Sequence, residues 1–249
     1  FDFRTPSFGA ASAQALYQTS IEMAKWADHH GFASVVVSEH HCVDDGFLPS
    51  PLVLAGALAS CTESIGISVS ALLAPLHDPI RLAEDVAVLD LVSGGRVTIV
   101  AGLGYRPVEY AALGKRFDRR GRLLEECLEV LFKSWSGEPF EHNGEIIRVT
   151  PKPASPIRDV IVIGGSSPVA ARRAARFGLS FCPPLHDEEL NEIYLAECER
   201  LAVEEPKISD PGEPWMLLVS EDPDRAWAES GPYLLHDART YSSWQVPGQ

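Results

Sequence analysis

The sequence predicts an α/β fold in which a parallel sheet is covered by helices. Short runs rich in β-branched residues alternate with helix-like segments along all 249 residues. Four expected helices start with the same two-residue pattern, a serine or aspartate that can cap the helix followed by a proline that suits its first turn. These starts are Ser50-Pro51, Asp78-Pro79, Ser167-Pro168 and Asp222-Pro223. Repeated strand–helix units of this kind favour parallel strands joined by crossover helices.

Seven segments have the composition of strands. Their valine and isoleucine residues pack well in a sheet that is buried on both faces. They span residues 1–3, 33–38, 65–73, 96–101, 159–163, 179–182 and 215–219, and the first is only the end of a strand. An open doubly wound sheet tolerates seven strands, whereas a closed (β/α)8 barrel needs an eighth. The five residues after Trp244 are too few to supply it, so a barrel would imply a chain that is incomplete at its C-terminus.

The helical segments show apolar residues at a spacing of three or four. Leu124, Leu128, Leu131 and Trp135 form one such line in the segment 118–135. Other helices are expected at 10–30, 50–61, 78–94, 168–177, 187–203 and from 222 onward, the last interrupted near Gly231-Pro232. The hairpin signal Asn143-Gly144 breaks the alternation and predicts a β-ribbon inserted at about 138–152. We otherwise expect a single domain over residues 1–249.

Charge and composition exclude several classes of partner. The formal net charge of −14 disfavours nucleic acids and anionic membranes, because both are polyanions. No apolar run approaches the ~20 residues of a membrane span, and no signal peptide is visible. The chain begins with Phe1 rather than methionine, so we expect its natural start to lie upstream. The five cysteines lie far apart with no CxxC spacing, which favours neither disulfides nor a zinc site and suits the cytoplasm.

The strand at 33–38 ends in three titratable residues, Glu39, His40 and His41. The carboxyl ends of strands are where α/β folds place their chemistry. Imidazole titrates near neutrality, so it can donate and accept protons during a reaction. Adjacent histidines on a strand point in opposite directions, and the sequence places no third ligand, so we expect no metal site. His77 and His186 also each follow a strand and are further candidate pocket residues.

Two glycine-rich segments follow strands. Gly164, Gly165, Ser166 and Ser167 open a helix, where backbone N–H groups and the helix dipole suit a phosphate group. An ordinary helix cap explains this segment equally well. Gly102 and Gly104 lack the third glycine of a dinucleotide-binding motif, and we interpret them as leaving room for a flat ring beside the strand end.

The order and spacing of several motifs resemble those of the bacterial luciferase-like flavin oxidoreductases. The matching motifs extend from about residue 34 to 235. They include Ser-Glu-His-His at 38–41, Ala-Pro-Leu-His-Asp-Pro-Ile-Arg at 74–81, Leu-Asp-Leu-Val-Ser-Gly-Gly-Arg at 89–96, Ile-Gly-Gly-Ser at 163–166 and Ser-Glu-Asp-Pro at 220–223. The resemblance implies a TIM-like (β/α)8 barrel, here without its eighth strand and C-terminal helix. It also implies FMN or coenzyme F420 bound at the carboxyl ends of the strands.

The resemblance further implies roles for individual residues. His40 takes the position of the catalytic histidine, and Glu39 and His41 flank it. The segment 164–167 takes the position of the loop that holds the cofactor phosphate. Ser70 and Ala71 lie where the family has a non-prolyl cis peptide packed against the flavin.

The substrate pocket is expected after the strand at 96–101. Tyr105 and Arg106 are the candidates to line it, whereas Glu109 is interpreted equally well as a solvated helix residue.

The implied function is the oxidation or reduction of a small organic substrate by a flavin or deazaflavin. A monooxygenase would receive reduced FMN from a separate flavin reductase and would use oxygen. An F420 enzyme would transfer hydride with His40 as acid or base, and the paired glycines at 164–165 slightly favour it. The resemblance also implies a homodimer.

Two other functions stay open. One is a catalytically silent flavin-binding homologue, because the eighth strand is missing. The other is a barrel enzyme without flavin, which would need a lysine or paired carboxylates at strand ends. No lysine follows an expected strand, which disfavours Schiff-base chemistry.

Overall fold

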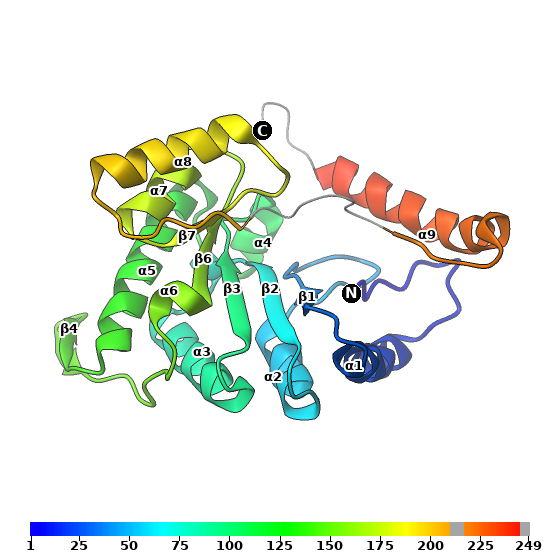
Figure 1. The fold of residues 1–249 in the computed structure, drawn as a ribbon, viewed down its shortest axis with the longest axis horizontal. Coiled ribbons are helices and arrows are strands. Elements are labelled where there is room, and N and C mark those ends of the chain that lie inside the picture. Colours follow the sequence, from blue (N-terminus) through cyan, green and yellow to red (C-terminus); the bar gives the residue numbers. More distant parts are fainter. Residues whose placement is uncertain (210–216, 245–249) are drawn as a thin grey trace.

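A parallel sheet forms the centre of the computed structural model, which describes residues 1–209 and 217–244. Its strand order is β1-β2-β3-β6-β7, and all four neighbouring pairs are parallel. The strands are β1 (Ser34–Val37), β2 (Gly66–Leu72), β3 (Val97–Ala101), β6 (Ile161–Gly164) and β7 (Ser180–Cys182). Helices separate successive strands, as Figure 1 shows. The α/β class with a parallel sheet is therefore confirmed, and the sheet of the described residues is open rather than closed into a barrel.

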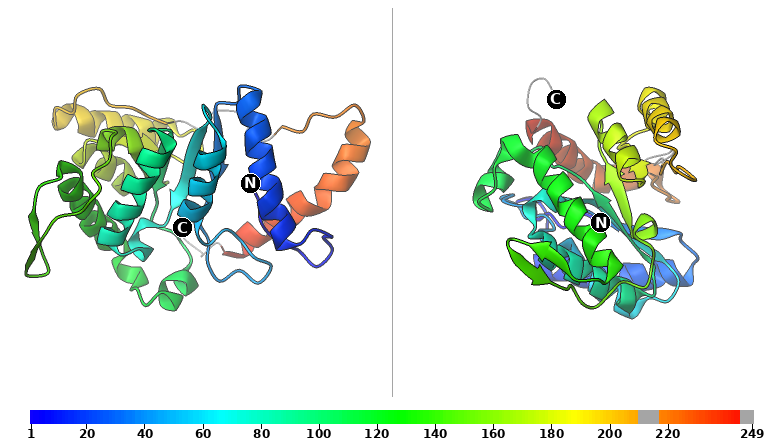
Figure 2. Two further views of the ribbon diagram at one scale, coloured as in Figure 1. Left: turned by 90° about the horizontal axis from the view of Figure 1, so that it is seen from below. Right: turned by 90° about the vertical axis from the view of Figure 1, so that its left-hand side faces the viewer.

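The helices occupy the connections between strands. They are α1 (Ala13–His29), α2 (Pro51–Cys61), α3 (Pro79–Ser93), α4 (Pro107–Ala112), α5 (Arg120–Ser136), α6 (Ile157–Val160), α7 (Pro168–Arg176), α8 (Glu188–Arg200) and α9 (Pro223–Trp244), with short 3₁₀ turns at Ala74–Leu76 and Phe117–Arg119. Asp78 and Ser167 accept hydrogen bonds from backbone N–H groups of α3 and α7, as predicted. Ser50 makes no such bond, although Pro51 begins α2. The left view of Figure 2 shows α1, α2 and α3 side by side.

The hydrophobic core lies on the helix-covered face of the sheet. Side chains alternate between the two faces of each strand, and Val69, Ile99 and Ile163 on one face are almost completely buried. The predicted line of α5, which includes Leu124 and Leu128, packs in the same core. The opposite face carries Ser34, Ser68, Ser70, Thr98 and Ser180 together with Val36, Val100 and Val162.

The predicted β-ribbon is present. Strands β4 (Phe140–His142) and β5 (Glu145–Ile147) pair antiparallel. Asn143 and Gly144 connect them with φ angles of 52° and 85°. A two-residue hairpin turn that matches the twist of its strands requires positive φ at both central residues. The hairpin predicted from the Asn-Gly pair is therefore confirmed.

Three predicted strands differ from the structure. Residues 1–3 form no strand; instead the Phe1 ammonium group donates to the Val36 carbonyl oxygen at 3.1 Å, and the ring of Phe3 stacks on α1. The strand expected from residue 159 starts at Ile161, because Pro156 leads into the single-turn helix α6. Of the strand expected at 215–219, residues 215 and 216 lie outside the described residues, and 217–219 are exposed and unpaired in the sheet.

The last helix also differs from the prediction. Helix α9 continues through Gly231 and Pro232 without interruption. The carbonyl group that loses its helical partner belongs to Ala228, which is exposed, so water can satisfy it. No helix in the described parts of the chain has the length and apolarity needed to cross a membrane.

Helix α9 lies against the amino-terminal segment, apart from the core. It has no buried residue. Asp237 pairs with Arg4, His236 bonds to Asp45, and Tyr233 contacts Phe8 with ring centroids 5.2 Å apart. Figure 1 shows α9 beside the segment that leads into α1. This placement brings the last turn of α9 to the carboxyl end of β1.

Candidate functional site

The carboxyl ends of β1, β2 and β3 meet at one edge of the sheet. The backbone N–H of Glu39 donates to the carbonyl oxygen of Ala71 at 3.2 Å. The N–H of Gly102 donates to the Leu72 carbonyl oxygen at 2.9 Å. Residues that were predicted from three separate segments of the sequence therefore lie together.

His40 is held by Glu109, for which the sequence left a pocket residue and a solvated helix residue equally open. Nδ1 of His40 lies 3.0 Å from Oε1 of Glu109, and both side chains are buried. The same oxygen accepts the backbone N–H of His41 at 3.0 Å and Nη1 of Arg106 at 3.1 Å. The other oxygen, Oε2, is buried and has no partner in the described chain.

The charge state of Glu109 follows from these contacts. Burial by itself raises the pKa of the carboxyl group. The hydrogen bonds from His40 and from the His41 N–H, together with the nearby Arg106 charge, outweigh burial and lower the pKa below its usual range. Because Glu109 is then an anion that can only accept, Nδ1 of His40 carries a proton.

Glu39 and His41 form a second cluster. Oε1 of Glu39 accepts from Nε2 of His41 and Nε2 of His77, each at 2.9 Å, and Oε2 accepts the Leu73 N–H at 2.6 Å. Burial opposes ionisation of Glu39, but these bonds lower its pKa to about 2. The bond to Glu39 raises the pKa of His41. Glu39 is thus an anion that links the loop after β1 to the connection between β2 and α3, which carries Leu73 and His77.

Small residues line the edge beside these clusters. The Ser70–Ala71 peptide is cis, as the family resemblance implied. A Cβ atom at Gly102 would lie 2.8 Å from the Ala71 Cβ, and one at Gly104, where φ is 71°, would lie 3.2 Å from Leu73. Only glycine allows the loops after β2 and β3 to approach this closely. The result is an edge with few protruding side chains.

Close packing explains the two glycines of the loop at 164–167, and helix capping explains its last serine. A Cβ at Gly164 would lie 2.7 Å from the Val100 Cγ1, and one at Gly165 would lie 2.6 Å from the Ala170 Cβ. The Ser167 hydroxyl accepts the Ala170 N–H at 3.3 Å and caps α7. Ser166 is exposed. The loop follows β6 and therefore lies at the same edge of the sheet as His40.

Aromatic rings surround His40. The ring centroids of Phe47, Tyr105, Tyr241 and Trp244 lie 4.7, 5.8, 5.8 and 4.9 Å from that of His40. The Tyr105 hydroxyl is buried and has no partner in the described chain, and burial raises its pKa. The two predicted pocket residues, Tyr105 and Arg106, therefore lie at the site.

Arg106 fixes the arrangement rather than facing an open pocket. Its Nη1 donates to the His41 carbonyl oxygen at 2.6 Å as well as to Glu109. Its Cζ lies 4.2 Å from the centroid of the Trp244 ring, a cation–π contact. The sequence prediction missed Tyr241 and Trp244, and the signal that would have paired them is their three-residue spacing, which places both on one face of α9.

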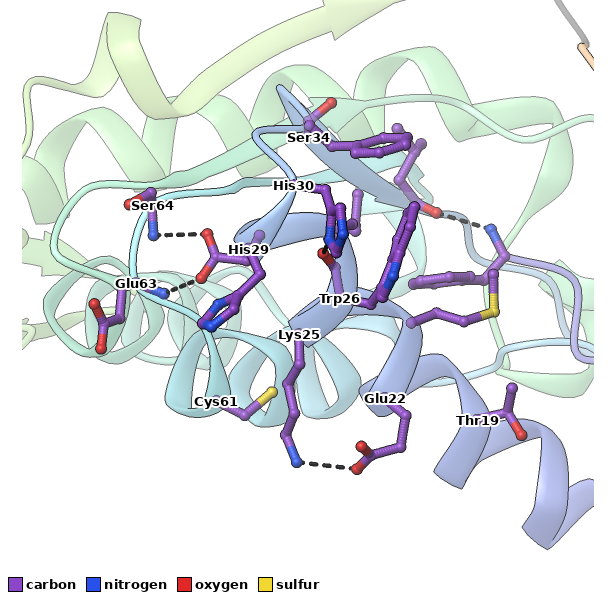
Figure 3. Close-up of a pocket in the computed structure, with 17 residues that line it drawn as sticks. Thr19, Glu22, Lys25, Trp26, His29, His30, Ser34, Cys61, Glu63 and Ser64 are labelled. Atoms are coloured by element: carbon purple, nitrogen blue, oxygen red, sulfur yellow. Dashed lines mark hydrogen bonds and ion pairs between the residues drawn. The ribbon is translucent and has the colours of Figure 1, made fainter. Parts of the chain in front are cut away.

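A separate pocket of about 1110 Å³ lies along the start of β1, between α1 and the loop after α2 (Figure 3). Several of its polar groups are paired locally. Lys25 donates to Glu22 at 3.0 Å, and Nδ1 of His30 lies 2.7 Å from the Trp26 carbonyl oxygen. Asp28 accepts the backbone N–H groups of Glu63 and Ser64. These contacts stabilise the local structure, and the acid–base pairs lie at the other end of β1.

Comparisons with known proteins agree with this arrangement. The family model described as luciferase-like monooxygenase matches residues 3–246. The oxygenase component of the flavin-dependent trigonelline monooxygenase of Acinetobacter baylyi is 28% identical over 207 residues, which cover 78% of this chain and 57% of that protein. The chain spans between 52% and 66% of the length of the first curated relatives that it matches.

Solved structures share the fold. The monooxygenase RslO1 of Streptomyces bottropensis superposes with a TM-score of 0.82 at 22% identity, over 98% of this chain and 77% of that one. An F420-dependent secondary alcohol dehydrogenase superposes with a TM-score of 0.61, also at 22% identity, over 78% of this chain and 62% of that one. With the family match over nearly the whole sequence, the chain belongs to the luciferase-like monooxygenase family.

Proposed function

We propose that this protein is an oxidoreductase that uses a reduced flavin or deazaflavin at the carboxyl ends of β1, β2 and β3 to transform a small organic substrate. The buried pair of His40 and Glu109 carries the proposal. Glu109 accepts the Nδ1 proton of His40 and leaves Nε2 as the nitrogen for proton exchange. A positioned imidazole of this kind contributes a typical factor of about 10² to 10⁴ to a reaction.

The residues at the edge fit a flat, polar ring system. Tyr105 and Glu109 each have a buried polar atom that lacks a partner in the described chain. Ser70, Ala71 and Gly102 form a surface with small side chains next to them. These residues would contact the ring, with Gly104 beside them, and the loop 164–167 would hold the phosphate at the start of α7. When bound, the reduced cofactor supplies the electrons of the reaction.

The side chains of the protein have three tasks in this proposal. His40 exchanges a proton at Nε2, and Glu109 holds the imidazole in the required tautomer. Arg106 stabilises the ionised Glu109 and the loop that carries His41. Phe47 and Trp244 pack on His40 and exclude water from it. Glu39 and His41 support the loop through their own ion pair.

Monooxygenation is the first version of the reaction. The oxygenase component from Acinetobacter baylyi supports it and supports a separate reductase as the partner that delivers reduced flavin. Hydride transfer with F420 is the second version, supported by the structural similarity to an F420-dependent alcohol dehydrogenase and by the paired glycines at 164–165.

Anaerobic titration with reduced FMN, and separately with reduced F420, tests the proposal. Spectral changes that saturate at micromolar concentrations of one cofactor are expected, and failure to bind either would overturn the proposal. His40→Ala should then lower turnover on a panel of small ketones, aldehydes and alcohols about 10²-fold or more, with cofactor affinity unchanged. His29→Ala, at an exposed helix end, is the matched control. Unchanged turnover in His40→Ala would show that His40 is only structural.

A further inference from the structure

Aromatic rings from distant segments meet at His40. Phe47 follows β1, Tyr105 follows β3, and Tyr241 with Trp244 belongs to the last turns of α9. Tyr241 and Trp244 lie on one face of the helix, with ring centroids 5.1 Å apart. We call these four residues the aromatic wall.

Arg4 lies buried against the aromatic wall. Its side chain is 2% exposed, and its Cζ lies 5.3 Å from the Phe47 centroid and 5.8 Å from the Tyr241 centroid. Nη2 of Arg4 donates to Asp2 at 2.7 Å and also pairs with Asp237. Its Nη1 is buried and has no partner in residues 1–209 and 217–244. A buried guanidinium N–H without an acceptor is costly, so the position favours a ligand with an acceptor oxygen.

Unsatisfied buried polar atoms concentrate around this wall. Arg4 Nη1, Tyr105 Oη and Glu109 Oε2 all belong to residues that contact the wall or His40. In the described chain, the other such side-chain atoms are on Asp90 and Asn191. Asp237 and His236, which attach α9, both have hydrogen-bonding partners. If the aromatic rings also served only to attach α9, we would expect the buried polar atoms beside them to have partners too. The wall thus combines flat apolar faces with two free donors and one free acceptor.

We propose that the aromatic wall and Arg4 form the substrate subsite, and that the substrate is a planar aromatic molecule carrying a carboxylate or another acidic oxygen. The proposal rests on the proposed function, because it places the substrate beside His40. Tyr241 and Trp244 stack on the ring of the substrate, and Arg4 Nη1 binds its oxygen. A flat ligand replaces ring–ring contacts within the wall by contacts of the same kind, and its oxygen pairs with the buried Nη1 of Arg4.

Calorimetric titration of the cofactor-free protein with anthraquinone-2-carboxylate tests the proposal. Two further probes separate its parts: 2-methylanthraquinone is planar but uncharged, and cyclohexanecarboxylate is charged but not aromatic. We expect anthraquinone-2-carboxylate to bind at least tenfold more tightly than either. Equal affinity for all three probes, or no binding at millimolar concentration, overturns the proposal.

Single substitutions test whether Arg4 binds the carboxylate and whether Trp244 stacks on the aromatic ring. Arg4→Lys keeps a charge beside Asp2 and Asp237 but removes the second guanidinium nitrogen. It should weaken anthraquinone-2-carboxylate about tenfold and leave 2-methylanthraquinone unchanged. Trp244→Leu should weaken both anthraquinones about tenfold. Tyr233→Leu, on the same helix but in edge contact with Phe8, is the control and should change neither. If the control weakens binding as much as Trp244→Leu, the wall only positions α9 and the proposal fails.

The titration with the aromatic probes and the titration with the cofactors can fail separately. Binding of reduced FMN or F420 without selective binding of the aromatic carboxylate would refute the subsite and leave the proposed function intact. Selective binding of the aromatic carboxylate without binding of either cofactor would refute the proposed function and support the subsite.

Discussion

Nδ1 of His40 lies 3.0 Å from Oε1 of Glu109, across 69 positions of the sequence. The contact joins the carboxyl end of β1 to α4, and both side chains are buried. Since the same oxygen also accepts the His41 N–H, the backbone next to His40 and its imidazole share one anchor. Any change at Glu109 therefore acts on the orientation of His40.

The first prediction concerns Glu109→Gln. The amide has nearly the same size but no charge, so it no longer compensates a positive charge on the imidazole. Turnover at pH 7 should fall about 10²-fold, while the affinity for the reduced cofactor stays within a factor of three. Steady-state kinetics and the anaerobic titration measure the two quantities. Glu126→Gln, on the exposed side of α5, is the control; equal turnover in both variants would show that Glu109 does not hold His40 in its working tautomer.

The second prediction concerns stability in acid. The pKa of Glu39 in the folded protein is about 2, below its ordinary value of 4.5. A lowered folded pKa means that ionised Glu39 stabilises the fold above pH 4.5, and that this contribution is lost as the pH falls from there towards 2. The free energy of unfolding of the wild type should decrease by about 2 kcal/mol more than that of Glu39→Gln between pH 7 and pH 3.

Urea denaturation at a series of pH values checks this loss. Glu63→Gln provides the control, because Glu63 is exposed in the loop between α2 and β2 and should follow the wild-type curve. Parallel curves for the wild type and Glu39→Gln would show that the contacts of Glu39 do not depend on its charge.

The third prediction separates packing from phosphate binding in the loop after β6. Gly164→Ala places a methyl group 2.7 Å from Val100 and should lower the free energy of unfolding by about 1–3 kcal/mol. Gly56→Ala, in α2, meets no atom within 4 Å and should instead raise it by about 0.5–1 kcal/mol. Thermal and urea denaturation measure both. A neutral Gly164→Ala with weakened cofactor binding would assign this glycine to the phosphate rather than to the sheet.

The fourth prediction concerns the attachment of α9. Asp237 pairs with the buried Arg4, so Asp237→Asn removes half of the charge that compensates this guanidinium. Hydrogen exchange of the α9 amides should accelerate about tenfold, equivalent to about 1.4 kcal/mol of lost docking free energy. Asp224→Asn, in the exposed first turn of α9, is the control. Unchanged exchange would mean that the aromatic contacts and the His236–Asp45 pair hold the helix without Asp237.

The sequence predicted features that depend on short stretches of chain. The strand that precedes Glu39, the capped start of α3 at Asp78 and the Asn143-Gly144 hairpin are local, since neighbouring residues determine them. The location of His40 at a strand end was also predictable, because β-branched residues before it define the strand.

Long-range partners were not predictable from local patterns. Glu109 follows a proline in a short helix, and only the packing of α4 on the loop after β1 turns its carboxylate towards His40. Tyr241 and Trp244 reach the site because Asp237 and His236 attach α9 to the amino-terminal segment. Their three-residue spacing places them on one helix face, but it does not indicate which part of the fold that face contacts.

Helix α9 buries no residue, yet it contributes Tyr241 and Trp244 to the surroundings of His40. The proton-handling pair and the core belong to other elements. Ligand preference and folding are therefore encoded in separable parts of the chain. A combinatorial library limited to the inward-facing positions of the last two turns of α9 would vary what the protein recognises, while every clone keeps the same hydrophobic core and the same acid–base machinery.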